Sequence, residues 1–392
     1  DRNEFEEHHD EHGDDDDDHD DHDEEEHHEE EEPALRMKLK TFNYNVKYHL
    51  PNTDGIDRII GIQGMHQTNK NFGEEILIPD ASIKDFGIFY TLNKQWKTSS
   101  IQGGLRLDTR SLHTEKHLVQ HEDEVHVLNP ISKDYLSLTA SLGYKFNLLN
   151  NVTTRVNLAS GFRAPNLAEL ASNGVHHGTN RFEVGNANLE TEKNLQLDVS
   201  LEYKTDHFEL FGNGFYNKLN DYIYLSPTGE VEDGAPVFNY IQNNAKLFGG
   251  EFGFHLHPHP VDWLHLESSF ETVIGKQHNG NYLPLIPANT FKNTLRTEFS
   301  IADWFTNGYS NVTVTTTMAQ NNNSQFETPT DGYNLVNFGF GGDVTLKSLK
   351  FSTSLSITNV FDTKYTHHLS RLKSDGILNA GRNVVLGINF KI

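Results

Sequence analysis

The sequence lacks cysteine altogether and contains no run of 18 or more apolar residues. Without cysteine the chain can form neither disulfide bonds nor thiolate metal sites. A transmembrane helix needs about 20 consecutive apolar residues, so no such helix is expected. The signatures of a P-loop, a G-x-S-x-G nucleophile elbow and an H-E-x-x-H metalloprotease are absent as well, and we therefore do not expect an enzyme.

Positive charge is scarce, with 32 basic residues against 56 acidic ones and a formal net charge of −24. The imbalance is local, because residues 1–32 hold 21 of the acidic residues and only one of the basic ones. The rest of the chain is nearly balanced, with 35 acidic and 31 basic residues. Binding of nucleic acid needs a basic stripe, and the sequence has none, so a nucleic-acid partner is not expected.

What the sequence does contain, from about residue 34 onward, is alternation of apolar and polar residues. In the segment 194–203 (NLQLDVSLEY), Leu195 and Leu197 share one face of an extended chain, and Gln196 and Asp198 share the other. Alternation over about ten residues is what a tilted strand needs to cross a bilayer. About fifteen such strands are expected, near 35–49, 57–67, 83–94, 97–109, 132–147, 150–161, 193–205, 207–220, 246–258, 262–276, 290–301, 309–320, 333–344, 349–360 and 381–392.

The connections between these strands alternate strictly between short and long. Short turns are expected at 50–56, 95–96, 148–149, 206, 259–261, 302–308 and 345–348. Long loops are expected at 1–34, 68–82, 110–131, 162–192, 221–245, 277–289, 321–332 and 361–380. Outer-membrane barrels have brief periplasmic turns and long outside loops, so the pattern predicts an all-β, antiparallel transmembrane β-barrel.

The alternative is a soluble all-β protein, such as a propeller or a stacked sandwich. Such a protein has no reason to sort its loops by side, and a closed barrel of fifteen strands is too wide for side chains to fill. Lipid must then face the apolar side of the strands. An odd number of strands cannot close antiparallel, and the chain begins without Met or a signal peptide. We therefore expect a fragment, with at least one further strand upstream.

Motifs in the expected loops and strand ends resemble the TonB-dependent receptor family. They are 160–190 (SGFRAPNLAELASNGVHHGTNRFEVGNANLE), 284–287 (PLIP), 331–340 (DGYNLVNFGF), 357–365 (ITNVFDTKY) and 381–392 (GRNVVLGINFKI), in the family's order. Within the family, FNYNVKYHLPNTDGIDRIIGIQG, GEEILIPDASIKDFGIFY and GGLRLDTR resemble the zinc-uptake receptors. The family's N-terminal plug, its energy-coupling box and the first strands of a barrel of about 22 are missing from the chain.

The resemblance implies an integral protein of the outer membrane of a Gram-negative bacterium, in contact with its lipid. Residues 1–33 are then a disordered, His/Asp/Glu-rich extracellular loop, and residues 34–392 are the C-terminal part of the receptor barrel. The resemblance also implies transport driven by the TonB energy-coupling complex, acting through the absent plug. No catalytic cofactor is expected, since zinc or another divalent metal would be the transported ligand.

Imidazoles and carboxylates are interleaved in residues 4–32, and these are ligand types that suit zinc. The histidines of this tract are His8, His9, His12, His19, His22, His27 and His28. With Phe5 as its one apolar side chain, the tract cannot bury a core and is expected to be disordered without metal. Its sites are then weak and interchangeable, suited to collecting cations. Copper and nickel would bind as well, and a solvated acidic loop is the plainer interpretation.

Histidines also occur in three other loops expected on the same side. The candidate ligands there are His113, His117 and His121 in loop 110–131, together with His176 and His177 in loop 162–192. Each alone is an ordinary polar loop residue, but together they indicate a His-lined vestibule. His126, His367 and His368 lie in the same group of loops. His255, His257, His259 and His265 are expected at the opposite, periplasmic end, facing the lumen or the interface and not acting as uptake ligands.

The sequence thus predicts a TonB-dependent transporter of a divalent metal, with zinc as the expected cation. The first alternative is uptake of a metal chelate or another small nutrient, contacted by aromatic residues in 221–245 and 321–332. The second is a structural or adhesive surface barrel that transports nothing.

Overall fold

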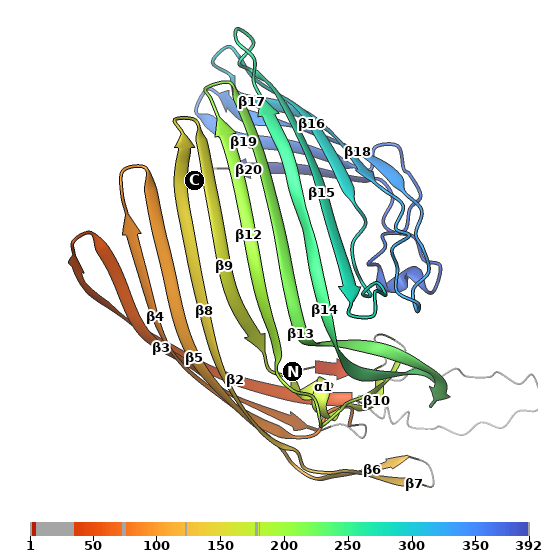
Figure 1. The fold of residues 1–392 in the computed structure, drawn as a ribbon. Helices are drawn as coiled ribbons and strands as arrows, with labels where there is room; N and C mark the ends of the chain where they lie inside the picture. The colour runs from red at the N-terminus through yellow and green to blue at the C-terminus, as the bar shows by residue number, and fades with distance from the viewer. Residues whose placement is uncertain are drawn as a thin grey trace, which may run out of the picture.

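One large antiparallel sheet makes up most of the computed structural model (Figure 1), which describes residues 2–4, 35–72, 76–121, 124–176, 179 and 181–390. Eighteen strands of the described residues belong to this sheet. Fifteen of them form a meander in which each strand pairs with the next along the chain. They are β2 (Leu35–Thr53), β3 (Ile56–Asn71), β4 (Ala81–Gln95), β5 (Ser99–Thr114), β8 (Ser132–Leu149), β9 (Val152–Arg163), β12 (Glu192–Lys204), β13 (Phe208–Glu232), β14 (Ala235–Leu256), β15 (Leu264–Gln277), β16 (Thr290–Ile301), β17 (Phe305–Thr317), β18 (Tyr333–Leu346), β19 (Leu349–Thr358) and β20 (Asn383–Phe390). The prediction of about fifteen strands in an antiparallel barrel wall is confirmed.

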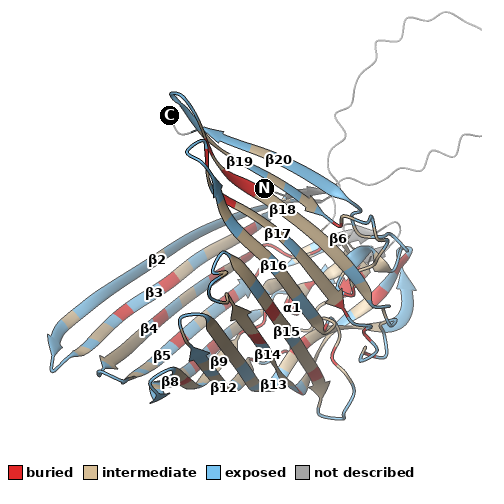
Figure 2. Cartoon of the chain, turned by 90° about the horizontal axis from the view of Figure 1, so that it is seen from above, coloured by how far each residue is buried: buried red, intermediate tan, exposed pale blue. Residues whose placement is uncertain are grey.

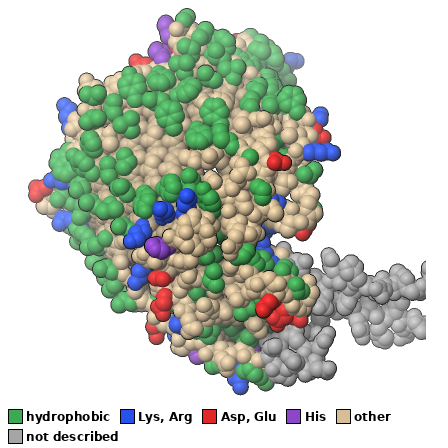
Figure 3. Space-filling view, turned by 45° about the vertical axis from the view of Figure 1, so that its right-hand side comes forward, with side chains coloured by type: hydrophobic (Ala, Val, Ile, Leu, Met, Phe, Trp, Pro, Cys, Tyr) green, Lys and Arg blue, Asp and Glu red, His purple; other side chains and the backbone are tan. Residues whose placement is uncertain are grey.

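The wall is strongly curved, and its two faces differ in a way opposite to that of a soluble protein (Figure 2). In β12 the apolar residues are the exposed ones, since Leu195 is 50% and Leu197 42% exposed. Gln196 and Asp198, which alternate with them along the strand, are half-buried. Hydrophobic side chains cover much of the outer surface in Figure 3. Apolar surface on this scale is stable only against lipid, so the convex face is the membrane-facing one.

Short connections gather at one end of the sheet and long ones at the other (Figure 1). The turn between β2 and β3 is Asp54–Gly55, where both residues have positive φ. All three tryptophans, Trp96, Trp263 and Trp304, lie in short turns and are about half exposed. Indole rings favour the boundary between hydrocarbon and water. The tryptophans therefore mark the membrane boundary at the short-turn end.

The long connections contain more regular structure than the sequence predicted. Loop 110–131 holds the hairpin of β6 (His117–His121) and β7 (Glu124–Leu128), and loop 162–192 holds α1 (Leu167–Ala171), β10 (Asn173–His176) and β11 (Arg181–Val184). Loop 359–382 contains the short 3-10 helix η2 (Arg371–Lys373). None of the helices in the described part of the chain is long and apolar enough to cross a membrane.

The expectation of a loop at 221–245 was wrong. β13 and β14 continue as a paired hairpin as far as the turn Asp233–Gly234, whose two residues have φ values of 48° and 70°. Two adjacent positive φ angles are typical of a type I′ turn, which matches the twist of a hairpin. β11 then pairs in parallel with this extension of β14. The segment reads as a loop in sequence because a register shift between Leu219 and Tyr222 interrupts its alternation.

The packed apolar core lies at the long-loop end. The first cluster of buried residues consists of Ile83, Leu112, Leu170, Leu189 and Ile223. Another contains Phe182, Ala235 and Val237, where β11 meets β14. Since these clusters join α1 and the folded loops to the strand ends, the loops form a fixed structure above the wall.

Candidate functional site

The acidic, His-rich tract is attached to the long-loop end of the sheet. β1 (Arg2–Glu4) pairs antiparallel with the start of β2, so Arg2 is opposite Met37 and Glu4 is opposite Leu35. The segment between β1 and β2 therefore leaves from and returns to one point at this end. That segment contains seven predicted ligands, all outside the described residues: His8, His9, His12, His19, His22, His27 and His28. His177, in loop 162–192, also lies outside the described residues.

His117 is the predicted ligand with the most defined surroundings. It begins β6, and its Nε2 accepts a hydrogen bond from the backbone N–H of Asp80 at 3.1 Å. The same Nε2 lies 3.7 Å from Oδ1 of Asp80. That carboxylate also accepts hydrogen bonds from the backbone and side-chain amides of Asn71, at 2.7 and 2.9 Å. A cation bound here through Nε2 would have to replace the bond from Asp80.

The other predicted ligands are dispersed along the same end. His113 lies near the end of β5, exposed, opposite Ser82 on one neighbouring strand and Ser132 on the other. His121 ends β6, and Nδ1 of His176, at the end of β10, lies 2.7 Å from Oγ1 of Thr179. The structure therefore places His113, His117, His121 and His176 at one end of the sheet, and among the side chains it describes there, those of His113, His117 and His176 do not come together in one coordination group.

An ion-pair network holds loop 162–192 over the inside of the wall. Nη1 of Arg163, the last residue of β9, donates to both carboxylate oxygens of Glu169 in α1, at 2.6 and 2.8 Å. Nη2 of Arg163 donates to Glu192 at 3.0 Å. Asn166 and Glu169 form a capping box at the start of α1. Because such reciprocal bonds satisfy the free N–H groups of a helix start, this five-residue helix is fixed by its caps.

A cavity of about 980 Å³ opens between the extended hairpin and the neighbouring loops. Tyr222, Tyr224 and Phe238 line it from the hairpin, and Phe326 lines it from the loop after β17. Charged groups on its wall are Glu169, Arg181, Glu327, Arg371 and Asp375. Aromatic walls with a few charged groups suit an organic ligand of moderate size.

His368 lies beside this cavity and is almost fully buried. Its Nδ1 is 2.8 Å from Oγ1 of Thr330, and its Nε2 is 3.9 Å from Oε1 of Glu327. Burial lowers the pKa of His368, and the positive charge of Lys373 lowers it further. The imidazole is therefore neutral at neutral pH and acts as a packed, hydrogen-bonded part of loop 359–382.

Sequence reasoning missed a different group of possible ligands. Among the residues that the structure describes, three metal-ligating side chains lie with their ligand atoms within 4.8 Å of one another: His207, His259 and Asp262. They belong to two short turns, at the end opposite the predicted ligands. The spacing of the HLHPHP segment, 255–260, was the available signal, but His207 is 52 positions away from His259.

Fold and site together define an outer-membrane β-barrel wall with folded loops at one end. A profile of the TonB-dependent receptor-like β-barrel family matches residues 32–360. The chain belongs to this family, whose members are receptors and transporters of the Gram-negative outer membrane.

Solved structures share the fold at low sequence identity. The copper transporter OprC is 18% identical, with a TM-score of 0.75 over 91% of this chain and 57% of that one. The FrpB iron transporter from Neisseria meningitidis (F3-3 variant) is 14% identical, with a TM-score of 0.66 over 92% and 56%. The ferric yersiniabactin uptake receptor FyuA from Yersinia pestis is 12% identical, with a TM-score of 0.66 over 91% and 54%. The chain thus spans little more than half the length of these structures.

Proposed function

We propose that this chain is part of a TonB-dependent outer-membrane transporter that takes up a divalent transition metal, with zinc as the expected cation. The observation that carries the proposal is the pairing of β1 with β2, because it attaches both ends of the acidic, His-rich segment to the long-loop end. Energy coupling through TonB is part of the proposal and rests on the family. The OprC and FrpB structures, named as copper and iron transporters, are consistent with metal as cargo.

Two physical effects would act in sequence at the long-loop end. The negative charge of residues 1–32 raises the local concentration of divalent cations, an effect that salt screens. Imidazoles then select transition metals over magnesium and calcium, which prefer oxygen ligands. Many weak, interchangeable sites release a cation readily. In this proposal His113, His117, His121, His176 and His177 form the next set of ligands toward the barrel.

Replacing the seven tract histidines by asparagine, with every carboxylate retained, tests the selective step. We expect less cell-associated zinc and slower growth in zinc-limited medium, with no change when zinc is plentiful. The matched control keeps the histidines and replaces Asp14 to Asp18 by asparagine. It should lower uptake mainly at low ionic strength, because it changes attraction and not ligation. If the histidine variant takes up scarce zinc like the unaltered receptor, the proposal is wrong.

The cavity of about 980 Å³ favours a second candidate function, the uptake of a metal chelate. A chelate would stack on Tyr222, Tyr224 and Phe326 while its charge met Arg181 or Arg371. Tyr224→Ala should then weaken chelate uptake and leave uptake of free zinc unchanged. Tyr216→Ala, on the same strand but on the exposed apolar face, is the matched control. Equal chelate uptake by both variants would count against this candidate.

A further inference from the structure

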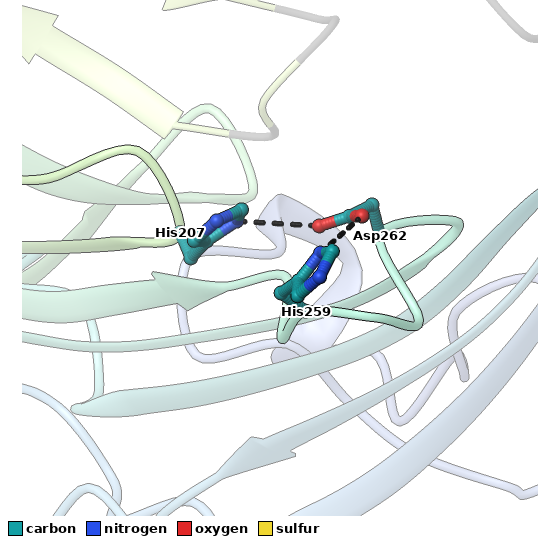
Figure 4. Close-up of side chains that lie close together, drawn as sticks. All are labelled: His207, His259 and Asp262. Atoms are coloured by element: carbon teal, nitrogen blue, oxygen red, sulfur yellow. Dashed lines mark hydrogen bonds and ion pairs between the residues drawn. The ribbon is translucent and has the colours of Figure 1, made fainter.

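Two short turns that are distant in sequence meet at the short-turn end of the sheet. β13 begins at Phe208, which is opposite Leu256 at the end of β14. The turn before β13 and the turn after β14 therefore lie side by side, and the backbone N–H of His257 donates to the carbonyl oxygen of His207 at 3.0 Å. Figure 4 shows His207 and His259 each joined to the carboxylate of Asp262.

The geometry of these three side chains is close to that of a metal site. One carboxylate oxygen of Asp262 lies 3.2 Å from Nδ1 of His207, and the other lies 3.2 Å from Nδ1 of His259. In a tetrahedral site with bonds of about 2.0 to 2.1 Å, ligand atoms are about 3.3 to 3.4 Å apart. Both distances are close to this edge length, but they reach different oxygens of Asp262, so the carboxylate has to turn to present one oxygen to a shared cation. All three side chains are at least 48% exposed, so small rotations can bring the imidazoles closer.

Further imidazoles continue from this group toward the inner face of the wall. The ring of His257 lies 5.3 Å from that of His207 and 5.4 Å from that of His265, measured between centroids. His255 and His265 share a hydrogen bond of 2.9 Å between Nε2 and Nδ1. His255 pairs in register with Glu267, whereas the exposed Phe252 and Leu266 lie on the alternate face of the same two strands, so this part of the cluster lies on the polar face.

Exposure rises along the cluster from the wall to the rim. The side chain of His265 is 11% exposed, that of His207 is 48% and that of His259 is 71%. A cation on the inner face would meet the enclosed imidazoles first and the open ones last. The short-turn end faces the periplasm in barrels of this kind, so the open end of the cluster lies where cargo leaves.

We infer that His207, His259 and Asp262 form a binding site for a divalent transition metal at the periplasmic rim of the barrel. Two imidazoles and one carboxylate leave a fourth tetrahedral position for water, as in sites that exchange a ligand. His257, His255 and His265 supply further ligands behind the site. A role in releasing the transported cation rests on the proposed function, whereas the binding itself does not.

The arrangement also has a simpler explanation, in which the two imidazoles only donate hydrogen bonds to Asp262. The two explanations differ in what zinc does to the imidazoles. A bound metal occupies a ring nitrogen and blocks its chemical modification, while a hydrogen bond to an exposed carboxylate leaves the other ring nitrogen reactive. A residue-by-residue measurement is needed, because the tract binds zinc in its own right under the proposed function.

The experiment measures carbethoxylation of each histidine by diethyl pyrocarbonate, read by mass spectrometry on the complete receptor in detergent micelles. We expect Zn²⁺ to slow modification of His207 and His259 at least tenfold, and Mg²⁺ to leave it unchanged. Asp262→Asn should remove this protection. Asp206→Asn also removes one negative charge, next to His207, and should leave the protection by zinc intact. In His259→Gln, protection of His207 should also fall.

Three results would overturn the inference: no protection by zinc, equal protection by magnesium, or protection that persists in both Asp262→Asn and His259→Gln. Heat-modifiable mobility on gels checks that each variant is folded, and the two substitutions provide independent tests. Failure here is distinct from failure of the proposed function. A receptor whose tract histidines prove irrelevant to uptake can still show zinc protection at the rim. Equally, a receptor whose tract histidines are needed for uptake can lack zinc protection at the rim.

Discussion

Replacing Arg163 by alanine should loosen the folded loop above the barrel without unfolding the wall. Arg163 is the cation that joins the carboxylates of Glu169 and Glu192, whose side chains are only 9% and 12% exposed. Glu169 also accepts a hydrogen bond from the backbone of Asn166, and Glu192 accepts one from the backbone of Ile223. Arg163→Ala therefore leaves two enclosed negative charges without their cation.

The size of the effect follows from the burial of the three groups. Removing one partner of a buried ion pair costs about 3 to 5 kcal/mol. Arg163 is itself 40% exposed, so water can hydrate the stranded carboxylates, and we expect about 2 to 3 kcal/mol. Since 1.4 kcal/mol corresponds to a factor of ten, local opening should become roughly 30- to 150-fold more frequent.

Hydrogen exchange followed by mass spectrometry measures this opening in peptides covering α1 and β10. The amides to watch include those of Leu170 and Ser172, which donate to the carbonyl oxygens of Asn166 and Ala168. Arg155→Ala is the matched control, because Arg155 lies on the same strand and forms a partly exposed pair with Glu202 at 3.0 Å. Equal exchange in the two variants would refute the reasoning.

Two further predictions concern the orientation of the strands and the titration of one loop. Leu197→Arg places a charge on the lipid-facing side of β12 and should cost about 2 to 4 kcal/mol if the residue lies near the bilayer midplane, whereas Asp198→Asn on the inner face should cost little. Urea titration of folding into lipid vesicles measures both, and equal effects would contradict this assignment of the faces. Because the pKa of His368 is lowered in the folded state, its contribution to stability is present above its unfolded pKa of about 6.5 and is lost as the pH falls below that value. Exchange in residues 366–376, corrected for the intrinsic rate, should therefore rise between pH 7 and 5.5. His368→Gln should flatten this rise, and His367→Gln should retain it.

The sequence alone determined the fifteen strands of the meander and the two faces of the wall. Alternation is a local property, since successive side chains of a strand point to opposite faces whatever the rest of the chain does. In β12, Leu195 and Leu197 identify the apolar face directly from their spacing. The sorting of short and long connections is also visible in sequence, because both kinds are bounded by the same alternating segments.

Other features could not be predicted from the sequence, because they depend on packing between segments. The hairpin extension as far as Glu232 was missed since its ladder continues across a register shift that breaks the alternation. The small structure α1 is too short to form by helix propensity and depends on the bonds from Arg163 and Asn166.

The candidate ligands also divide into those that the sequence reveals and those that only the folded structure brings together. Composition identified the His-rich tract, because a count of residue types needs no fold. Only the tertiary structure decided that His207 lies beside His259 and Asp262, since the antiparallel register of β13 and β14 brings two turns together across 52 positions of sequence. Register is set by the whole sheet, and no local pattern around His207 encodes it.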